Sequence, residues 1–262
     1  MSGIWQRCEQ RPREGQREIL PVLAGMPRQG TPPLKSAPPK KKFQLLVLSF
    51  IVGLCGAWML APALLAPQPG GLPLNRDQAD AAYPRWPRAV LAAQIAAIRG
   101  DLWAEAAFTG ARFIWGDPGQ RRDPATPKEL NGIRVNAETA LKWAPINAAA
   151  WLLLSMLTPS APDGGSQVST FLEMSYLTAP NDARLAPLRL MRAATSTALA
   201  NKDLQYFVTN DIKELLNRGP EHQQDIVAAY QAAWAQNQPV LAALAADIDP
   251  EMARLLNLPQ SK

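Results

Sequence analysis

The residues that could do chemistry are few and widely spaced in this chain of 262 residues. There is one histidine, His222, directly after Glu221. Metal sites use several histidine, cysteine or carboxylate ligands, and a catalytic triad needs a histidine beside its nucleophile. We therefore interpret His222 as part of a solvated helix start, and we expect no metal, no cofactor and no catalytic residue.

Carboxylates are scattered along the chain. The one local cluster consists of Asp247, Asp249 and Glu251. Its spacing lacks the glycine and the distal glutamate of an EF-hand loop, so capping of a helix near Pro250 is the better interpretation. Asp211 and Glu214 are expected on helix faces with no catalytic role. A carboxylate-based enzyme acting on an envelope polymer stays open as an alternative, and it predicts two carboxyl groups ~5–10 Å apart in a concave cleft.

The charge of the chain is unevenly distributed. Nine basic and three acidic residues precede residue 43, a net charge of +6, and the remainder carries 18 against 19, a net charge of −1. A nucleic-acid-binding domain would need a basic folded face, so we expect no nucleic acid partner. The two cysteines, Cys8 and Cys55, both precede residue 66, which excludes a disulfide in the segment that follows.

Residues 43–66 form a run of 24 residues without a charge. About 20 apolar residues in a helix cross a bilayer core of ~30 Å, so the run predicts a transmembrane helix with Trp58 near its far interface. Lys40, Lys41 and Lys42 precede it, whereas the first basic residue beyond it is Arg76. The positive-inside rule then places the N-terminus in the cytoplasm. The three lysines either bind anionic lipid or act only as a topology signal.

Two alternatives to an uncleaved anchor fit parts of the pattern. A buried core helix is disfavoured because the run is long and has no polar stripe. A cleaved signal peptide is suggested by the sequence at 61–63, with Met26 as a second possible start, but the run exceeds the 7–15 residues usual for a signal. Gly53 and Gly56 give the helix a small face that could pack against a partner helix, as in a structural subunit of a larger membrane complex.

Four segments follow from these patterns. Residues 1–42 are rich in proline and predicted to be a disordered basic cytoplasmic tail, followed by the transmembrane helix at 43–66. Residues 67–74 contain proline and glycine and are predicted to be a spacer. Residues 75–262 are predicted to form an all-α domain of antiparallel helix pairs.

Apolar periodicity, prolines and glycines delimit the helices of this domain. Leu91, Ile95 and Ile98, for example, recur at helical spacing. The predicted helices are 87–99, 101–115, 128–143, 147–157, 166–178, 181–201, 203–217, 221–236, 239–246 and 250–256. The tryptophans expected mostly as core anchors are Trp103, Trp115, Trp143, Trp151 and Trp234.

Two similar segments of the chain indicate an internal repeat. Residues 143–148 and 178–183 lie 35 residues apart, and in each an Ala-Pro pair ends one helix shortly before an asparagine begins the next. Over residues 87–217 the chain resembles the tetratricopeptide repeat family, whose period is 34 residues. The family's full spacing of tryptophan, Leu-Gly, tyrosine, alanine and phenylalanine is absent. The resemblance implies a tetratricopeptide-like helical array, and an irregular helical bundle is the alternative.

Arg184, Arg189 and Arg192 fall on one predicted helix, where they form either a basic strip facing an acidic ligand or a solvated face. The sequence thus favours a non-catalytic, membrane-anchored module for protein interaction or assembly, since a stacked-helix surface needs no catalytic residues. The expected location is a bacterial inner membrane with the domain in the periplasm. Protein partners at the membrane are expected, with a polymer ligand as an option; a surface-polysaccharide export machine is suggested by analogy alone.

Overall fold

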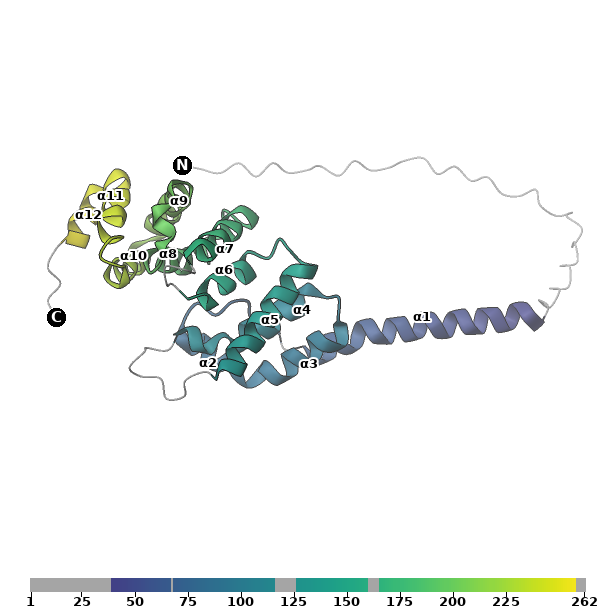
Figure 1. Cartoon of the computed structure of the whole chain (residues 1–262). Coiled ribbons are helices and arrows are strands. Elements are labelled where there is room, and N and C mark those ends of the chain that lie inside the picture. Colours follow the sequence, from purple (N-terminus) through teal and green to yellow (C-terminus); the bar gives the residue numbers. More distant parts are fainter. Residues whose placement is uncertain (1–38, 67, 116–125, 160–164, 258–262) are drawn as a thin grey trace, which may run out of the picture. The chain divides into compact units, whose positions relative to one another are not determined.

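A computed structural model describes residues 39–66, 68–115, 126–159 and 165–257. Within these ranges the protein is all helical and contains no strand (Figure 1). Most of the predicted tail lies outside the described residues, and the side chain of Trp115 is not described.

The elements, with η denoting 3-10 helices, are α1 (Pro39–Leu65), α2 (Arg76–Ala82), η1 (Tyr83–Arg85), α3 (Trp86–Ala96), α4 (Gly100–Gly110), η2 (Ala111–Trp115), α5 (Pro127–Trp143), α6 (Ala148–Leu157), α7 (Gly165–Thr178), α8 (Ala186–Ala194), η4 (Thr197–Ala200), α9 (Lys202–Arg218), α10 (Pro220–Ala232), α11 (Gln238–Ile248) and α12 (Pro250–Asn257).

The helix α1 is the one described helix that is long and apolar enough to cross a membrane. Its candidate span, Lys41–Leu65, has 25 residues. At about 1.5 Å per residue that length exceeds the ~30 Å hydrocarbon core of a bilayer. Pro62 does not end the helix, which continues for three residues to Leu65.

Local sequence explains where the domain's helices begin. The side chains of Asn75, Thr126, Asn147 and Asn201 accept hydrogen bonds from backbone N–H groups in the first turns of α2, α5, α6 and α9. Thr126 also forms a capping box with Glu129. Helices α3, α5, α8, α10 and α11 each have a proline within their first two positions, where its missing N–H costs nothing.

Chain neighbours pack together throughout the domain. Helix α4 packs on α3 and α5, α6 on α5 and α7, and α9 on α8 and α10, while α11 and α12 form the last pair. One large apolar cluster runs through the array from Leu72 to Leu256. Many of its members are alanines, which let helix axes approach closely.

A recurring hydrogen bond closes three turns of the array. Trp103 Nε1 donates to the carbonyl of Ala97 at 2.9 Å, and Trp151 Nε1 donates to that of Pro145 at 2.8 Å. Gln205 Nε2 donates in the same way to the carbonyl six residues before it, at 2.8 Å. Because the three donor residues lie 48 and 54 residues apart in the sequence, this hydrogen bond recurs without a fixed period.

The structure differs from the predicted helices in two main places: α2 and η1 lie at residues 76–85, where no helix was predicted, and α8 begins later than predicted. We predicted a helix over 181–201, but residues 180–185 form turns and α8 begins at Ala186. Asp182 explains the delay because its carboxylate accepts hydrogen bonds from the backbone N–H and the guanidinium of Arg184. This local pairing competes with helix formation.

Candidate functional site

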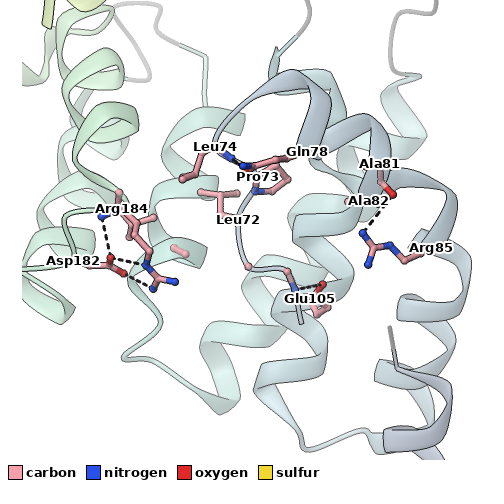
Figure 2. A pocket seen from close by; sticks show the side chains of 14 residues that line it. Leu72, Pro73, Leu74, Gln78, Ala81, Ala82, Arg85, Glu105, Asp182 and Arg184 are labelled. Carbon is pink, nitrogen blue, oxygen red and sulfur yellow. Dashed lines mark hydrogen bonds and ion pairs between the residues drawn. The ribbon is translucent and has the colours of Figure 1, made fainter. Parts of the chain in front are cut away.

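An open groove of about 430 Å³ lies between the N-terminal helices and the α7–α8 turn (Figure 2). Its walls come from five places in the chain, which are the segment 70–74, the α2–η1 region, α4, the start of α6 and the turn before α8. The charged side chains lining it are Arg85, Glu105, Asp182 and Arg184. The volume falls within the range of small-ligand and side-chain pockets.

The chain's own segment 70–74 forms part of the lining of this groove (Figure 2). The N–H of Gly70 donates to Glu105 Oε1 at 3.1 Å. Leu72 is only 6% exposed and belongs to the main apolar cluster. The N–H of Leu74 donates to Gln78 Oε1 at 2.9 Å. The predicted spacer is thus bound along the array instead of only joining it to α1.

Glu105 is a buried carboxylate at the base of the groove. Burial raises its pKa above the ordinary value, and the N–H groups of Gly70 and Gly71, together with Arg85, lower the pKa in part. The side chain therefore acts as a hydrogen-bond acceptor for the backbone of the segment that precedes α2.

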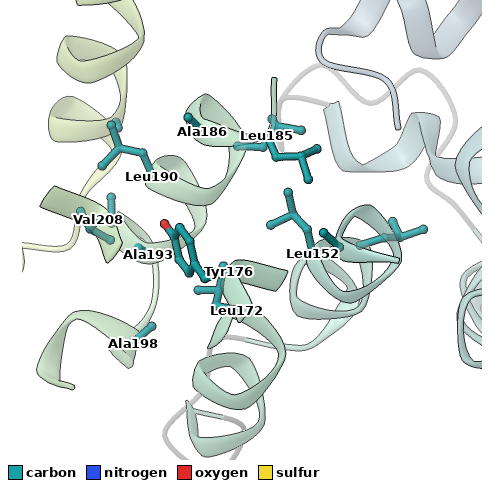
Figure 3. Close-up of a cluster of buried hydrophobic side chains, with 14 of the residues drawn as sticks. Leu152, Leu172, Tyr176, Leu185, Ala186, Leu190, Ala193, Ala198 and Val208 are labelled. Carbon is teal, nitrogen blue, oxygen red and sulfur yellow. The ribbon is translucent and has the colours of Figure 1, made fainter. Parts of the chain in front are cut away.

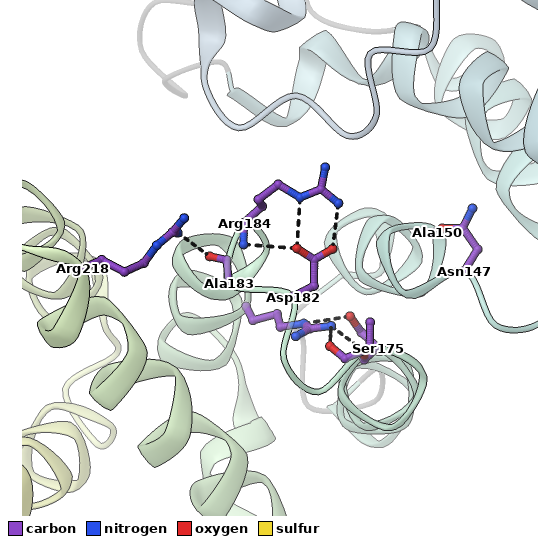
Figure 4. A network of polar contacts seen from close by, with 9 residues as sticks. Asn147, Ala150, Ser175, Asp182, Ala183, Arg184 and Arg218 are labelled. Atoms are coloured by element: carbon purple, nitrogen blue, oxygen red, sulfur yellow. Dashed lines mark hydrogen bonds and ion pairs between the residues drawn. The ribbon is translucent and has the colours of Figure 1, made fainter. Parts of the chain in front are cut away.

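The opposite wall is held by an ion pair. Arg184 Nη2 lies 3.0 Å from Asp182 Oδ2, and the two groups make paired hydrogen bonds (Figure 4). The hydrogen bond from Arg184 lowers the pKa of Asp182. Arg218 Nη1 donates to the carbonyl of Ala183 in the same turn at 3.1 Å, which links the turn to the end of α9.

Two carboxylates with pKa values shifted in opposite directions resemble a general acid and base pair. In this groove both are engaged in structural contacts. Glu105 accepts a backbone N–H from segment 70–74, and Asp182 is held by Arg184. The arrangement is therefore better suited to holding an extended chain than to moving a proton.

A second polar cluster lies inside the array and was missed by the sequence analysis. Tyr176 sits among apolar side chains of the core (Figure 3), and its hydroxyl donates to Asp211 Oδ2 at 2.7 Å. The guanidinium of Arg189 lies 4.7 Å from the centre of the Tyr176 ring. Burial raises the pKa of Asp211 to about 7. Asp211 is therefore a core residue, whereas Glu214 lies exposed on a helix face as predicted.

The three arginines predicted as a strip do not share an exposed face. Arg189 is fully buried and donates to Ser175 Oγ at 3.0 Å and to the carbonyls of Ser175 and Ala179. Arg192 donates to the carbonyl of Thr158, and Arg184 precedes α8 in the turn. The prediction was wrong because Arg189 and Arg192 bind carbonyls at the C-terminal ends of α7 and α6, where cations are favoured.

The remaining candidates have structural partners. His222 Nδ1 lies 3.2 Å from Asp225 Oδ2. Asp249 Oδ1 accepts the N–H of Glu251 at the start of α12, which confirms the predicted capping role. No three His, Cys, Asp or Glu side chains in the described ranges are grouped so as to hold a metal ion.

The predicted anchor residues lie along α1. Lys41, Lys42 and Trp58 are exposed, and Lys40 lies in the first turn. A Cβ added at Gly53 or Gly56 would meet no atom within 4 Å, so both positions have open space beside them. Packing of this small face against another helix stays a prediction.

In comparisons with protein families, curated proteins and solved structures, no significant similarity to this chain was found. The class of protein is therefore defined by its own features. It is an all-α protein of packed helix pairs with one helix long and apolar enough to span a membrane.

Proposed function

We propose that this protein is a membrane-anchored, non-catalytic interaction module whose tetratricopeptide-like helical domain binds a protein partner at the membrane. The observation that carries the proposal is the open groove of about 430 Å³, which is lined by charged and apolar side chains together with the chain's own segment 70–74. This mixed lining offers hydrogen-bonding groups and apolar surface to a segment of another protein.

The chemistry of the groove indicates the kind of partner. Arg85 and Arg184 supply donors, Glu105 and Asp182 supply acceptors, and Leu185 and Ala149 supply apolar surface. Such a mixed lining suits an extended protein segment with both charged and apolar side chains. A polymer ligand would use only the polar part of the lining.

The tetratricopeptide-like interpretation is supported by helices paired along the chain. The location of the domain in the periplasm of a bacterial inner membrane is proposed from the three lysines before the span and the positive-inside rule. Confinement to a membrane raises the local concentration of partners held in the same membrane.

Site-specific photocrosslinking in the protein's own membranes tests the proposal. A photoreactive amino acid at Ala81, an exposed residue in the groove lining, should give one defined protein adduct. The same amino acid at Ala243, an exposed alanine on α11, is the matched control and should not. Arg184→Glu should weaken the adduct from Ala81 because it reverses a charge in the lining. The same adducts from both positions, or none from Ala81 in a membrane-inserted protein, would contradict the proposal.

One observation favours a carboxylate-based enzyme as the second candidate: Glu105 and Asp182 line the same groove and have oppositely shifted pKa values. This alternative predicts that Glu105→Gln and Asp182→Asn abolish turnover of an envelope polymer while the Ala81 adduct persists. The interaction proposal predicts no turnover in the unaltered protein.

A further inference from the structure

The fully buried residues of helix α3 are all small, whereas a large apolar residue of the helix and one just beyond it are exposed. Its buried residues are Ala89, Ala92, Ala93 and Ala96. Leu91 is 47% exposed, and Ile98, just beyond the helix, is 63% exposed. The apolar periodicity that predicts this helix therefore belongs to a face that the domain itself does not cover.

Further exposed apolar residues lie on the α5–α6 turn, which packs against the start of α4. Gly100 lies so close to this turn that an added Cβ would be 2.7 Å from the Cβ of Ala144. Beside Ala144, Trp143 is 47% exposed and Ile146 is 78% exposed. We call Leu91, Ile98, Trp143 and Ile146 together the apolar edge.

Basic groups accompany the apolar edge. The ammonium group of Lys142 lies 5.8 Å from the centre of the Trp143 ring. Arg99, next to Ile98, pairs with Asp101 at 2.5 Å. A tryptophan beside a lysine and exposed aliphatic side chains is the composition found where proteins enter the interfacial region of a bilayer.

The residue that follows α1 packs on the helices that carry part of the apolar edge. Ala66 directly follows the last residue of α1 and packs against a small cluster formed by α3 and α4. The members of that cluster are Ala89, Ala93, Ala96, Leu102 and Ala106. The end of the proposed span is therefore joined to the same helix pair whose first helix and connecting turn carry Leu91 and Ile98.

We propose that the apolar edge docks into the lipid interface of the membrane that α1 crosses. The inference rests on the proposed membrane insertion of α1, and it adds a second contact between the domain and the bilayer. Burying the exposed aliphatic and aromatic groups in the interface removes them from water, and Lys142 can extend its charge toward lipid headgroups. A docked edge fixes which side of the domain faces the membrane.

Lipid quenching of site-specific fluorescent labels tests this docking on the full chain. Cys8 and Cys55 are replaced by serine, and a single cysteine replaces Ile98, Ile146, Tyr206 or Leu54. Each labelled protein is reconstituted in nanodiscs of phosphatidylcholine and phosphatidylglycerol with nitroxide groups on the upper acyl chain. Tyr206, 66% exposed on α9, is the control for exposure, and Leu54 reports whether α1 is in the bilayer.

We expect the labels at 98, 146 and 54 to be quenched by lipid and the label at 206 to be quenched only by aqueous iodide. Quenching at 54 alone would overturn docking and leave the anchor intact, and no lipid quenching at any position would overturn both. Labels at 98 and 146 shielded from lipid and from iodide would show that a protein surface covers the edge. As a second measurement, Ile98→Asp with Ile146→Asp should abolish lipid quenching of a label at position 91; unchanged quenching would contradict the proposal.

Discussion

At the scale of single residues, the least expected feature is charge inside the core. Arg189 and Asp211 are both buried, and Tyr176 lies between them, with its ring near the guanidinium and its hydroxyl on the carboxylate. The three residues come from α8, α9 and α7. A buried polar cluster of this kind is costly unless its groups are paired, so it specifies how these helices fit together.

Asp211 should make stability depend on pH. Its pKa is raised to about 7 by burial, above the ordinary value of 3.8, so the folded state favours the protonated form. The stability that it contributes is complete below the unfolded pKa and is lost as the pH rises through the folded pKa. Asp211→Asn should therefore be more stable than the unaltered protein at about pH 8, with a change of roughly 2–3 kcal/mol in their difference between about pH 5 and pH 8.

Denaturant unfolding of the detergent-solubilised protein, followed by circular dichroism, measures this difference. Glu214→Gln, at an exposed position on the same helix, is the control and should show little change with pH. If the difference between the Asp211→Asn variant and the unaltered protein were the same at both pH values, the raised pKa of Asp211 would be refuted.

Two glycines make a matched test of close packing. A Cβ at Gly100 would lie 2.7 Å from Ala144 Cβ and 2.9 Å from the carbonyl oxygen of Ala140, whereas one at Gly132 meets nothing within 4 Å. Gly100→Ala should cost about 1–3 kcal/mol because backbone must move. Gly132→Ala, inside α5, should stabilise by roughly 0.5–1 kcal/mol because it lowers the entropy of the unfolded chain. Thermal unfolding of both variants measures these changes in stability. A stabilising effect of Gly100→Ala would show that the start of α4 and the α5–α6 turn are not in contact.

At the scale of helices, arginines from one helix complete the C-terminal ends of others. Arg134 and Arg192 donate to the carbonyls of Leu157 and Thr158 at the end of α6. Arg189 does the same at the end of α7. The last carbonyls of a helix have no partner within it, so these contacts both satisfy them and fix the neighbouring helix.

Removing the arginine at α7 should therefore loosen the join between α7 and α8. Arg189→Met keeps the apolar bulk but removes the guanidinium donor from Ser175 Oγ and from the carbonyls of Ser175 and Ala179, which should cost about 2–4 kcal/mol. Arg184→Met, at an exposed position five residues earlier, should cost less than about 1 kcal/mol. Denaturant unfolding of both variants makes the comparison. Equal losses of stability in the two variants would mean that the buried contacts of Arg189 stabilise the protein no more than the exposed contacts of Arg184.

Helix positions were largely predictable because their signals are local. Prolines, glycines and capping asparagines delimit most helices, and the predicted 128–143 and 203–217 match α5 and α9 within one residue at each end. The start of α8 was missed because the side chain of Asp182 binds Arg184 and keeps the turn open. The resemblance between 143–148 and 178–183 did not reveal this pairing.

The parts of the candidate site that were missed depend on packing between distant segments. Periodicity indicated the helix at 87–99 but could not show that its alanine face packs inward and Leu91 outward. An arginine on a helix is ordinarily exposed, so nothing local marks Arg189 as buried. Nothing in a proline-glycine segment marks Leu72 as a core residue either, because the acceptor and the apolar site that hold it come from α4 and beyond.

At the scale of the whole molecule, the segment after α1 is part of the domain's structure. Ala66 packs on the α3–α4 cluster, Gly70 is bonded to Glu105, and Leu72 lies in the core. A free spacer would let the array move independently of its anchor, whereas a bound one limits that freedom. How firmly the segment is held therefore decides how freely the proposed groove can meet a partner.

Leu72→Ala should release this segment. The substitution removes a side chain that is 6% exposed and should cost about 2–4 kcal/mol, whereas Leu74→Ala, at a position 37% exposed, should cost less than about 1 kcal/mol. Because Arg76 follows closely, limited trypsin digestion of the membrane-inserted protein should cut there faster in the Leu72→Ala variant and at an unchanged rate in the Leu74→Ala variant. Equal cleavage of the two variants would show that Leu72 does not hold the segment. Faster cleavage with a stronger photocrosslink from Ala81 would show that the segment competes with the partner for the groove.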